Sequence, residues 1–150
     1  MNIITIDFET AYGGDLGFAK QTTEEYIRDP RFKAWGLCWK DYGAPEAAVW
    51  VTHAELPEWV KTIDWSRTAV IAQNAQFDVA ILSWIYDVHP AFIFDTLSMG
   101  RALRGIEVGN SLKKMAEDFG LPPKGEGLSP SENILDELPA NVEAILADYC

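Results

Sequence analysis

The alternation of apolar and polar positions divides the chain into short runs, several of which are typical of strands. Ile3 to Phe8 is apolar on both faces, as expected of a strand in the middle of a sheet. Trp35 to Lys40 and Glu46 to Val51 flank a turn rich in Gly and Pro, and they predict an antiparallel hairpin. Thr68 to Gln73 predicts another buried strand, and Ala91 to Phe94 a short one.

Helical patterns lie between and after these strands. Thr22 and Glu25 have the spacing of a capping box, and Pro30 stops the short helix that they begin. Glu55 to Ile63 predicts another short helix. Phe77 to Tyr86 is apolar almost all round, which predicts a buried helix.

Two later helices are predicted from an apolar stripe at helical spacing. The first begins at Asn110 or Ser111 and ends at Gly120, and its stripe consists of Leu112, Met115, Ala116 and Phe119. The second begins near Ala140, and its stripe consists of Val142, Ile145, Leu146 and Tyr149. Residues 121–139 between them are rich in Pro, Gly and Ser and predict a loop.

The order of these elements predicts an α/β fold. A hairpin comes first and is followed by strands that alternate with helices, which indicates a mixed sheet with helices packed on it. A chain of 150 residues fits one domain and can bury a real core, so residues 1–150 are expected to form a single domain.

The charge of the chain limits how it could bind nucleic acid. The net charge is −11, from 23 acidic and 12 basic residues, which is the wrong sign for holding nucleic acid by charge alone. A nuclease whose acids surround metal ions stays possible, because the ions reverse the local field. Four bases fall between Arg101 and Lys114, and a solvated helix face is the simpler interpretation of that group.

The lack of a secretory signal and the use of cysteine favour an intracellular protein. The chain has no apolar run near the roughly 18 residues that a membrane span needs, and it lacks the pattern of a secretory signal. Cys38 and Cys150 lie far apart, which predicts neither a disulfide framework nor a zinc cluster and favours a reducing compartment. We therefore expect no membrane partner and a location in the cytoplasm.

Candidate chemistry begins where the first strand ends. Asp7 and Glu9 stand two residues apart, so in a strand both side chains point to the same face. Two like charges on one face repel each other, and a hard divalent cation with oxygen ligands is the natural compensation. The plainer alternative is a polar strand end that meets solvent.

A second carboxylate segment, from Asn74 to Asp78, follows the strand Thr68 to Gln73. Asp78 then lies in the first turn of the next helix, where the helix dipole alone would account for an acid. If the two strands are parallel neighbours, Asp7, Glu9 and Asp78 converge at their carboxyl ends. Three such carboxylates suit two Mg²⁺ or Mn²⁺ ions about 4 Å apart.

These segments resemble a known family. The run from Asp7 to Thr10, the Asn74-x-x-Phe77-Asp78 segment and Tyr149 resemble, in this order, the three motifs of the DEDD (DnaQ-like) 3′–5′ exonucleases. The stretch from Thr22 to Phe32 resembles the start of bacteriophage family A DNA polymerases, whose N-terminal domain is a proofreading exonuclease of this kind. The segment Asp95-Thr96-Leu97 fits the same plan.

The resemblance implies a fold and a set of roles. The fold is ribonuclease H-like, a five-stranded mixed sheet with helices on both faces. Asp7 and Glu9 would bind two Mg²⁺ (or Mn²⁺) ions with Asp7 bridging them, Asp78 would help to hold the second ion, and Tyr149 would orient the attacking water. Substrate contacts are expected from Phe8, Thr10, Asn74 and Phe77, although a helix cap also accounts for Asn74 and core packing for Phe77.

The third motif departs from the family pattern. There the Tyr is followed four residues later by a metal-binding Asp, a position that lies beyond Cys150. Asp148 would face about 100° away from Tyr149 around the helix, so it is a poor substitute. Tyr149 also fits the apolar stripe and could be part of the core. We therefore expect a domain truncated at its C-terminus, with weak or no activity when isolated.

Three functions are compatible with these observations. The leading one is a two-metal-ion exonuclease that trims single-stranded DNA 3′ ends, proofreading for a phage DNA polymerase in the cytoplasm of a bacterium or of a phage-infected host. Its expected partners are a DNA 3′ end and either a polymerase domain or the missing C-terminal segment. The alternatives are an exoribonuclease on the same scaffold and a truncated module that docks onto another protein or binds nucleic acid.

Overall fold

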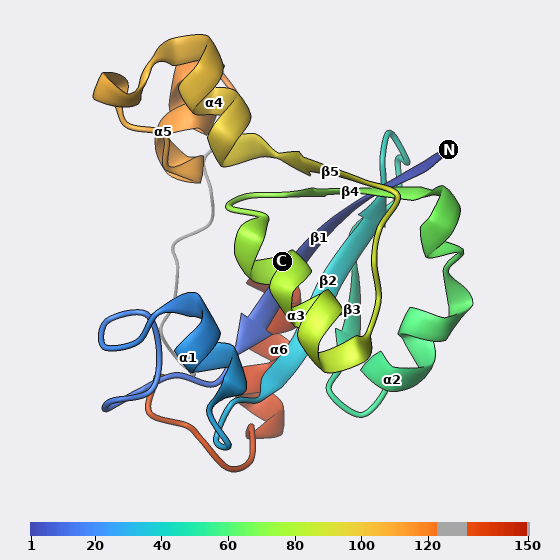
Figure 1. Ribbon diagram of the computed structural model, residues 1–150, viewed down its shortest axis with the longest axis vertical. Coiled ribbons are helices and arrows are strands. Elements are labelled where there is room, and N and C mark those ends of the chain that lie inside the picture. Colours follow the sequence, from blue (N-terminus) through green and yellow to red (C-terminus); the bar gives the residue numbers. More distant parts are fainter. Residues whose placement is uncertain (123–131, 150) are drawn as a thin grey trace.

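A mixed five-stranded sheet organises the chain, as Figure 1 shows. The computed structural model describes residues 1–122 and 132–149, with the side chain of Tyr149 outside the described part. The strands are β1 (Asn2–Thr10), β2 (Ala34–Asp41), β3 (Val49–Thr52), β4 (Thr68–Ala72) and β5 (Phe92–Asp95). Their order across the sheet is β3-β2-β1-β4-β5. The β1–β2 and β2–β3 pairs are antiparallel, whereas β1–β4 and β4–β5 are parallel. The predicted α/β class, the hairpin and the mixed sheet are confirmed.

The helices agree with the sequence pattern in position and differ from it in length. The α-helices are α1 (Thr23–Arg28), α2 (Leu56–Trp59), α3 (Gln76–Tyr86), α4 (Thr96–Arg104), α5 (Leu112–Asp118) and α6 (Ala140–Tyr149). Short 3₁₀ turns are η1 (Val60–Thr62), η2 (Trp65–Arg67) and η3 (Ile106–Val108). The helix predicted over residues 55–63 is therefore one α-helical turn that continues as a 3₁₀ turn. The capping box of α1 is present, with the Thr22 and Glu25 side chains each bonded to the other residue's backbone N–H.

Helices cover both faces of the sheet. On one face, Ile4, Ile6 and Phe8 of β1 are buried against residues of α1, α2 and α3. On the other face, Leu146 of α6 packs with Ala11 and Trp35. Strand alternation should place Trp35 on the side of Leu37, but the β1–β2 register shifts between Glu9 and Thr10 and turns Trp35 to the α6 side.

The prediction of a buried helix over residues 77–86 is wrong in part. Trp84 and Ile85 of α3 are 42% and 47% exposed, so this helix is not buried all round. In the stripe of α5, Met115 is buried but Leu112 and Phe119 are exposed. Figure 1 shows the physical reason for the exposure on α5, since α4 and α5 extend away from the sheet and pack on each other. An apolar groove of about 270 Å³ stays open between them.

None of the helices in the described part of the chain has both the length and the apolar character needed to cross a membrane.

Candidate functional site

Asp7 and Glu9 lie at the carboxyl end of β1 and on the same face of the sheet. Their partners across the β1–β2 ladder are Cys38 and Gly36. Partners in an antiparallel ladder project to the same side, so both carboxylates face the side that α6 covers. Asp7 is exposed and Glu9 is half-buried. The strand thus presents two acids side by side at its end, as the alternation predicts.

Asp78 reaches the same strand from the first turn of α3. Its Oδ1 accepts a hydrogen bond from the backbone N–H of Phe8 at 3.0 Å. This bond forms because β4 pairs with β1 only as far as Thr5, so the ladder has ended before Phe8. Only 3% of Asp78 is exposed. One hydrogen bond therefore joins two acidic segments that lie 70 residues apart in the sequence.

The electrostatics of Asp78 reflect its neighbours. Burial, together with the negative charge of Asp7 and a smaller contribution from Glu9, raises the pKa of Asp78 to about 8, against the opposing effect of the Phe8 N–H. At neutral pH this carboxyl group therefore keeps its proton when no cation is near. A positive ion beside the three acids would favour the ionised form and lower this pKa.

The donor set suits a hard cation in kind, although it does not form a complete cage. Carboxylate oxygens are the ligands that Mg²⁺ and Mn²⁺ prefer. Within residues 1–122 and 132–149, no group of three or more His, Cys, Asp or Glu side chains is arranged to hold a metal ion. Asp7 and Glu9 each make further interactions. The three carboxylates influence one another electrostatically without enclosing a common point.

The other residues singled out from the sequence differ in placement. Phe8 is buried and its ring stacks on Tyr86, with centroids 6.4 Å apart. Phe77 is half-buried and stacks on Tyr26 at 5.8 Å, in agreement with the packing interpretation. Asn74 is exposed with a left-handed φ of 60°, and its carbonyl accepts the N–H of Phe77 at 3.1 Å. Its side chain is not the cap of α3, whose N-cap is Ala75.

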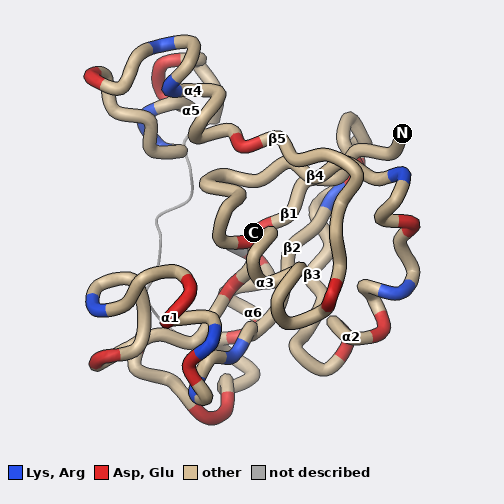
Figure 2. The backbone as a smooth tube through the Cα atoms, viewed as in Figure 1, with Lys and Arg blue, Asp and Glu red and all other residues tan. Residues whose placement is uncertain are grey.

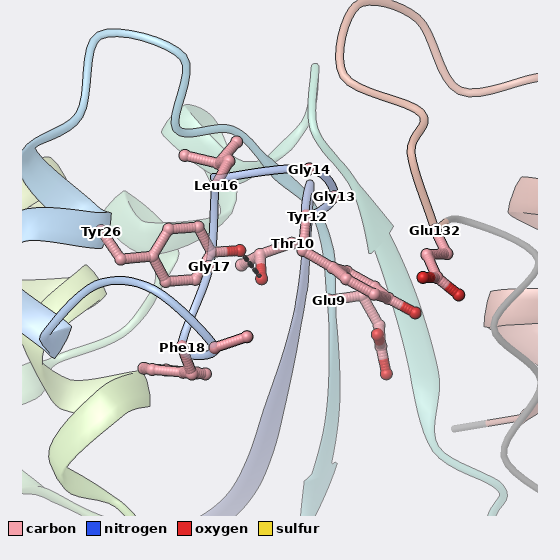
Figure 3. A pocket seen from close by; sticks show the side chains of 11 residues that line it. Glu9, Thr10, Tyr12, Gly13, Gly14, Leu16, Gly17, Phe18, Tyr26 and Glu132 are labelled. Carbon is pink, nitrogen blue, oxygen red and sulfur yellow. Dashed lines mark hydrogen bonds between the residues drawn. The ribbon is translucent and has the colours of Figure 1, made fainter.

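A pocket of about 480 Å³ opens beside Glu9. Figure 3 shows that it lies between the end of β1, the glycine-rich loop that follows it, Tyr26 and Glu132. Phe18 and Tyr12 contribute aromatic surface, and Thr10 lines the pocket near the hydroxyl of Tyr26. Aromatic side chains next to acidic groups can bind a planar ring, which stacks on the aromatic surface and donates its N–H groups to the acids.

The glycine-rich loop is held from the far end of the chain. The Asn133 N–H donates to the Tyr12 carbonyl at 2.8 Å, and the Gly14 N–H donates to Asn133 Oδ1 at 3.1 Å. A Cβ on Gly13 would come within 2.5 Å of the Asn133 Cα, so only glycine fits this approach. Asn133 is a residue that sequence reasoning missed, since a single polar residue in a loop carries no periodic signal.

The segment that resembles the third motif forms the end of α6. Tyr149 is the last residue of α6, and α6 is anchored beside the end of β1 by Leu146 and by the Trp50 Nε1–H, which donates to Glu143 at 3.4 Å. The side chain of Tyr149 lies outside the described residues. The predicted role of its hydroxyl group therefore stays a prediction.

The charged groups outside the site are mostly solvated. Figure 2 shows acidic positions spread along the chain and several basic ones in the α4–α5 region. Two of these, Arg104 and Lys114, pair with Asp118, the latter at 2.6 Å. Asp95 caps α4 and accepts the N–H of Ala75 at 3.2 Å, which ties β5 to the loop before α3. Burial acts to raise the pKa of Asp95, but hydrogen bonds from Ser98 and three backbone N–H groups outweigh it and lower the pKa.

The five-stranded mixed sheet and its helices define a class of protein, the α/β proteins of ribonuclease H-like fold. No family model and no curated protein matches the sequence. Solved structures do match. NrnC from Brucella melitensis superposes with a TM-score of 0.63 and 17% identity over 98% of this chain and 64% of that one. The catalytic core of RRP6 from Trypanosoma brucei gives 0.62 and 12%, over 98% and 37% of the two chains.

A third match is the apo form of a nuclease, with a TM-score of 0.62 and 17% identity over 99% of this chain and 66% of that one. NrnC has also been solved with bound Mg²⁺ and bound to pGG. This chain spans less than two thirds of the length of these proteins. At such identities the matches show the fold, and the ribonuclease H-like architecture implied by the motifs is confirmed.

Proposed function

We propose that this chain is a two-metal-ion 3′–5′ exonuclease domain. The observation that carries the proposal is the hydrogen bond from the Phe8 N–H to Asp78, since it brings the second acidic segment to the strand that bears Asp7 and Glu9. The fold neighbours add support, because one of them is a nuclease by name and another has been solved with bound Mg²⁺.

In this proposal Asp7, Glu9 and Asp78 would hold the ions. Two Mg²⁺ ions bound there would supply an activated water and stabilise the charge on the phosphate and the leaving oxygen. The raised pKa of Asp78 means that it must release its proton to become a ligand. Tyr149, at the end of the helix beside this face, would orient the water, as the family resemblance implies.

The pocket beside Glu9 is the substrate-binding site in this proposal. It is large enough for a nucleotide, and its aromatic side chains Tyr12 and Phe18 offer stacking surfaces for an unpaired base. Thr10 would contact the terminal sugar or phosphate. Phe8 and Phe77, which pack inward, would act by holding the acidic segments in place rather than through their rings, and Asn74 through the turn that it forms.

Calorimetric titration with Mn²⁺ tests the metal site directly. We expect binding by the native chain and by the control Asp87→Asn, whose side chain is fully exposed, and loss of binding in Asp7→Asn. Equal binding by all three proteins would refute the assignment of Asp7. No binding by the native chain would favour the docking module instead.

A second assay addresses the substrate. With protein in excess over a 5′-labelled single strand and Mn²⁺ present, we expect a ladder of products shortened one nucleotide at a time from the 3′ end, absent in Asp7→Asn. The phage polymerase resemblance leads us to propose DNA as the substrate and proofreading as the role. An RNA strand of the same sequence is the comparison, and faster shortening of the RNA would replace the DNA proposal with the exoribonuclease.

A further inference from the structure

Tyr26 is a buried tyrosine that touches both acidic segments without being part of either. It lies in α1 and is only 1% exposed. Its hydroxyl group is 2.6 Å from the Ala11 carbonyl oxygen and 2.8 Å from Thr10 Oγ1, the second contact drawn in Figure 3. A phenol has one proton and a carbonyl can only accept, so Tyr26 donates to Ala11 and accepts from Thr10.

The ring of Tyr26 makes the second connection. It stacks on Phe77 with centroids 5.8 Å apart and an interplanar angle of 5°, and it meets Phe18 and Phe32 edge to face. Phe77 directly precedes Asp78 in α3. One side chain therefore contacts the residue next to Glu9 at its hydroxyl end and the residue next to Asp78 with its face.

The hydroxyl group acts where the strand is irregular. The β1–β2 register shifts between Glu9 and Thr10, so the regular ladder that would fix the end of β1 is interrupted there. The Tyr26 hydroxyl group donates to the Ala11 carbonyl just beyond the register shift, and the Ala11 N–H donates to the Lys33 carbonyl at 2.8 Å. The backbone of Ala11 is thus held at its carbonyl by the Tyr26 side chain and at its N–H by Lys33, the residue before β2.

Packing alone does not explain a tyrosine at this place. A phenylalanine would keep every ring contact without burying a polar group, and a buried hydroxyl group is costly unless it is bonded. Burial also raises the pKa of Tyr26, so the phenol stays protonated and keeps its donor at all ordinary pH values. The contribution specific to tyrosine is therefore the pair of hydrogen bonds beside Glu9.

We propose that Tyr26 is a positioning residue for the metal-binding carboxylates, which fixes the direction of Glu9 relative to Asp78 through Thr10 and Phe77. This inference rests on the proposed function, because it assigns Tyr26 a role in the same site. It predicts that losing the hydroxyl group loosens the end of β1 while the aromatic packing and the fold persist.

The test is Tyr26→Phe, with Tyr42→Phe as the matched control because Tyr42 is 69% exposed. Groups that orient metal ligands typically change metal affinity by about 10- to 100-fold when removed, so we expect the Mn²⁺ dissociation constant of Tyr26→Phe to rise by about tenfold. Tyr42→Phe should bind like the native chain. In the trimming assay, repeated at several protein concentrations, the maximal single-turnover rate constant should fall while the half-saturating protein concentration stays unchanged.

A double-mutant cycle separates positioning from general stability. Thr10→Val removes the other hydroxyl group, and because both changes break the same unit, Tyr26→Phe with Thr10→Val should weaken Mn²⁺ binding no more than Tyr26→Phe alone. A lower melting temperature with native Mn²⁺ affinity in Tyr26→Phe would overturn the inference and leave the proposed function intact. A native chain that binds no Mn²⁺ and trims no strand would overturn both.

Discussion

Replacing Asp78 by Asn should remove the pH dependence that this buried carboxyl group gives to the fold. Asn has the same shape, and its Oδ1 can still accept the Phe8 N–H that Asp78 now accepts at 3.0 Å. It cannot ionise, so it escapes the cost of a negative charge that is buried beside Asp7.

The size of the effect follows from the pKa of Asp78. The value is about 8 in the folded chain, against 3.8 for an ordinary Asp. Between these two pKa values the Asp78 carboxyl group is ionised in the unfolded chain and protonated in the folded chain. The stability that the protonated group gives to the fold is therefore fully present below about pH 4 and is lost as the pH rises towards 8. At 1.36 kcal/mol per pH unit, the free energy of unfolding of the native chain should fall by up to about 4 kcal/mol between pH 4 and 7, relative to Asp78→Asn.

Urea unfolding at several pH values, with chelator present, measures this difference. We expect the two proteins to be nearly equal in stability at low pH and Asp78→Asn to be the more stable above neutrality. Adding Mn²⁺ at pH 7 should stabilise the native chain and leave Asp78→Asn much less affected, since a ligand stabilises the state that binds it. Parallel pH profiles for the two proteins would show that the reasoning about Asp78 is wrong.

Three further predictions concern packing and capping. Gly36→Ala places a Cβ against the Trp50 ring and should cost about 1–3 kcal/mol in urea unfolding, a loss that Trp50→Leu in the same chain should relieve. Thr22→Ala removes the capping box of α1 and should cost about 0.5–2 kcal/mol; an unchanged unfolding midpoint would contradict the role of the cap. Leu82→Ala, at a fully buried position, should cost about 2–5 kcal/mol, whereas Leu103→Ala, at a position 77% exposed, should stay within about 0.5 kcal/mol of the native chain.

The local pattern of apolar and polar residues predicts most of the strands and helices, but it does not predict which of their faces are buried by other elements. The run from Ile3 to Phe8 and the run from Thr68 to Gln73 predict central strands, and the capping box of Thr22 locates a helix start, because each of these signals is complete within a few residues. The exposure of Trp84 and Phe119 could not be predicted in the same way. An apolar stripe indicates which face of a helix can be buried, and whether another element reaches that face depends on distant parts of the chain.

The same distinction between local and distant contacts applies to the candidate site. Asp7 and Glu9 could be placed on one face from strand alternation, and Asp78 near them from the tendency of parallel strands to end at one edge. The register shift between Glu9 and Thr10 could not be predicted in this way, and neither could the hydrogen bond of the Tyr26 hydroxyl group beside it. Both depend on contacts between distant segments of the chain. A tyrosine in a short amphipathic helix looks like any other core residue until the partner of its hydroxyl group is known.

The contact between Gly13 and Asn133 has a consequence for how this protein is made. The wall of the pocket beside Glu9 joins residues 119 positions apart in the sequence, so it can close only after Asn133 has left the ribosome. Closing a loop of that length is an entropic cost that later contacts must offset, and contacts of such separation form slowly. The acidic strand is thus synthesised long before Asn133, the residue that completes its pocket.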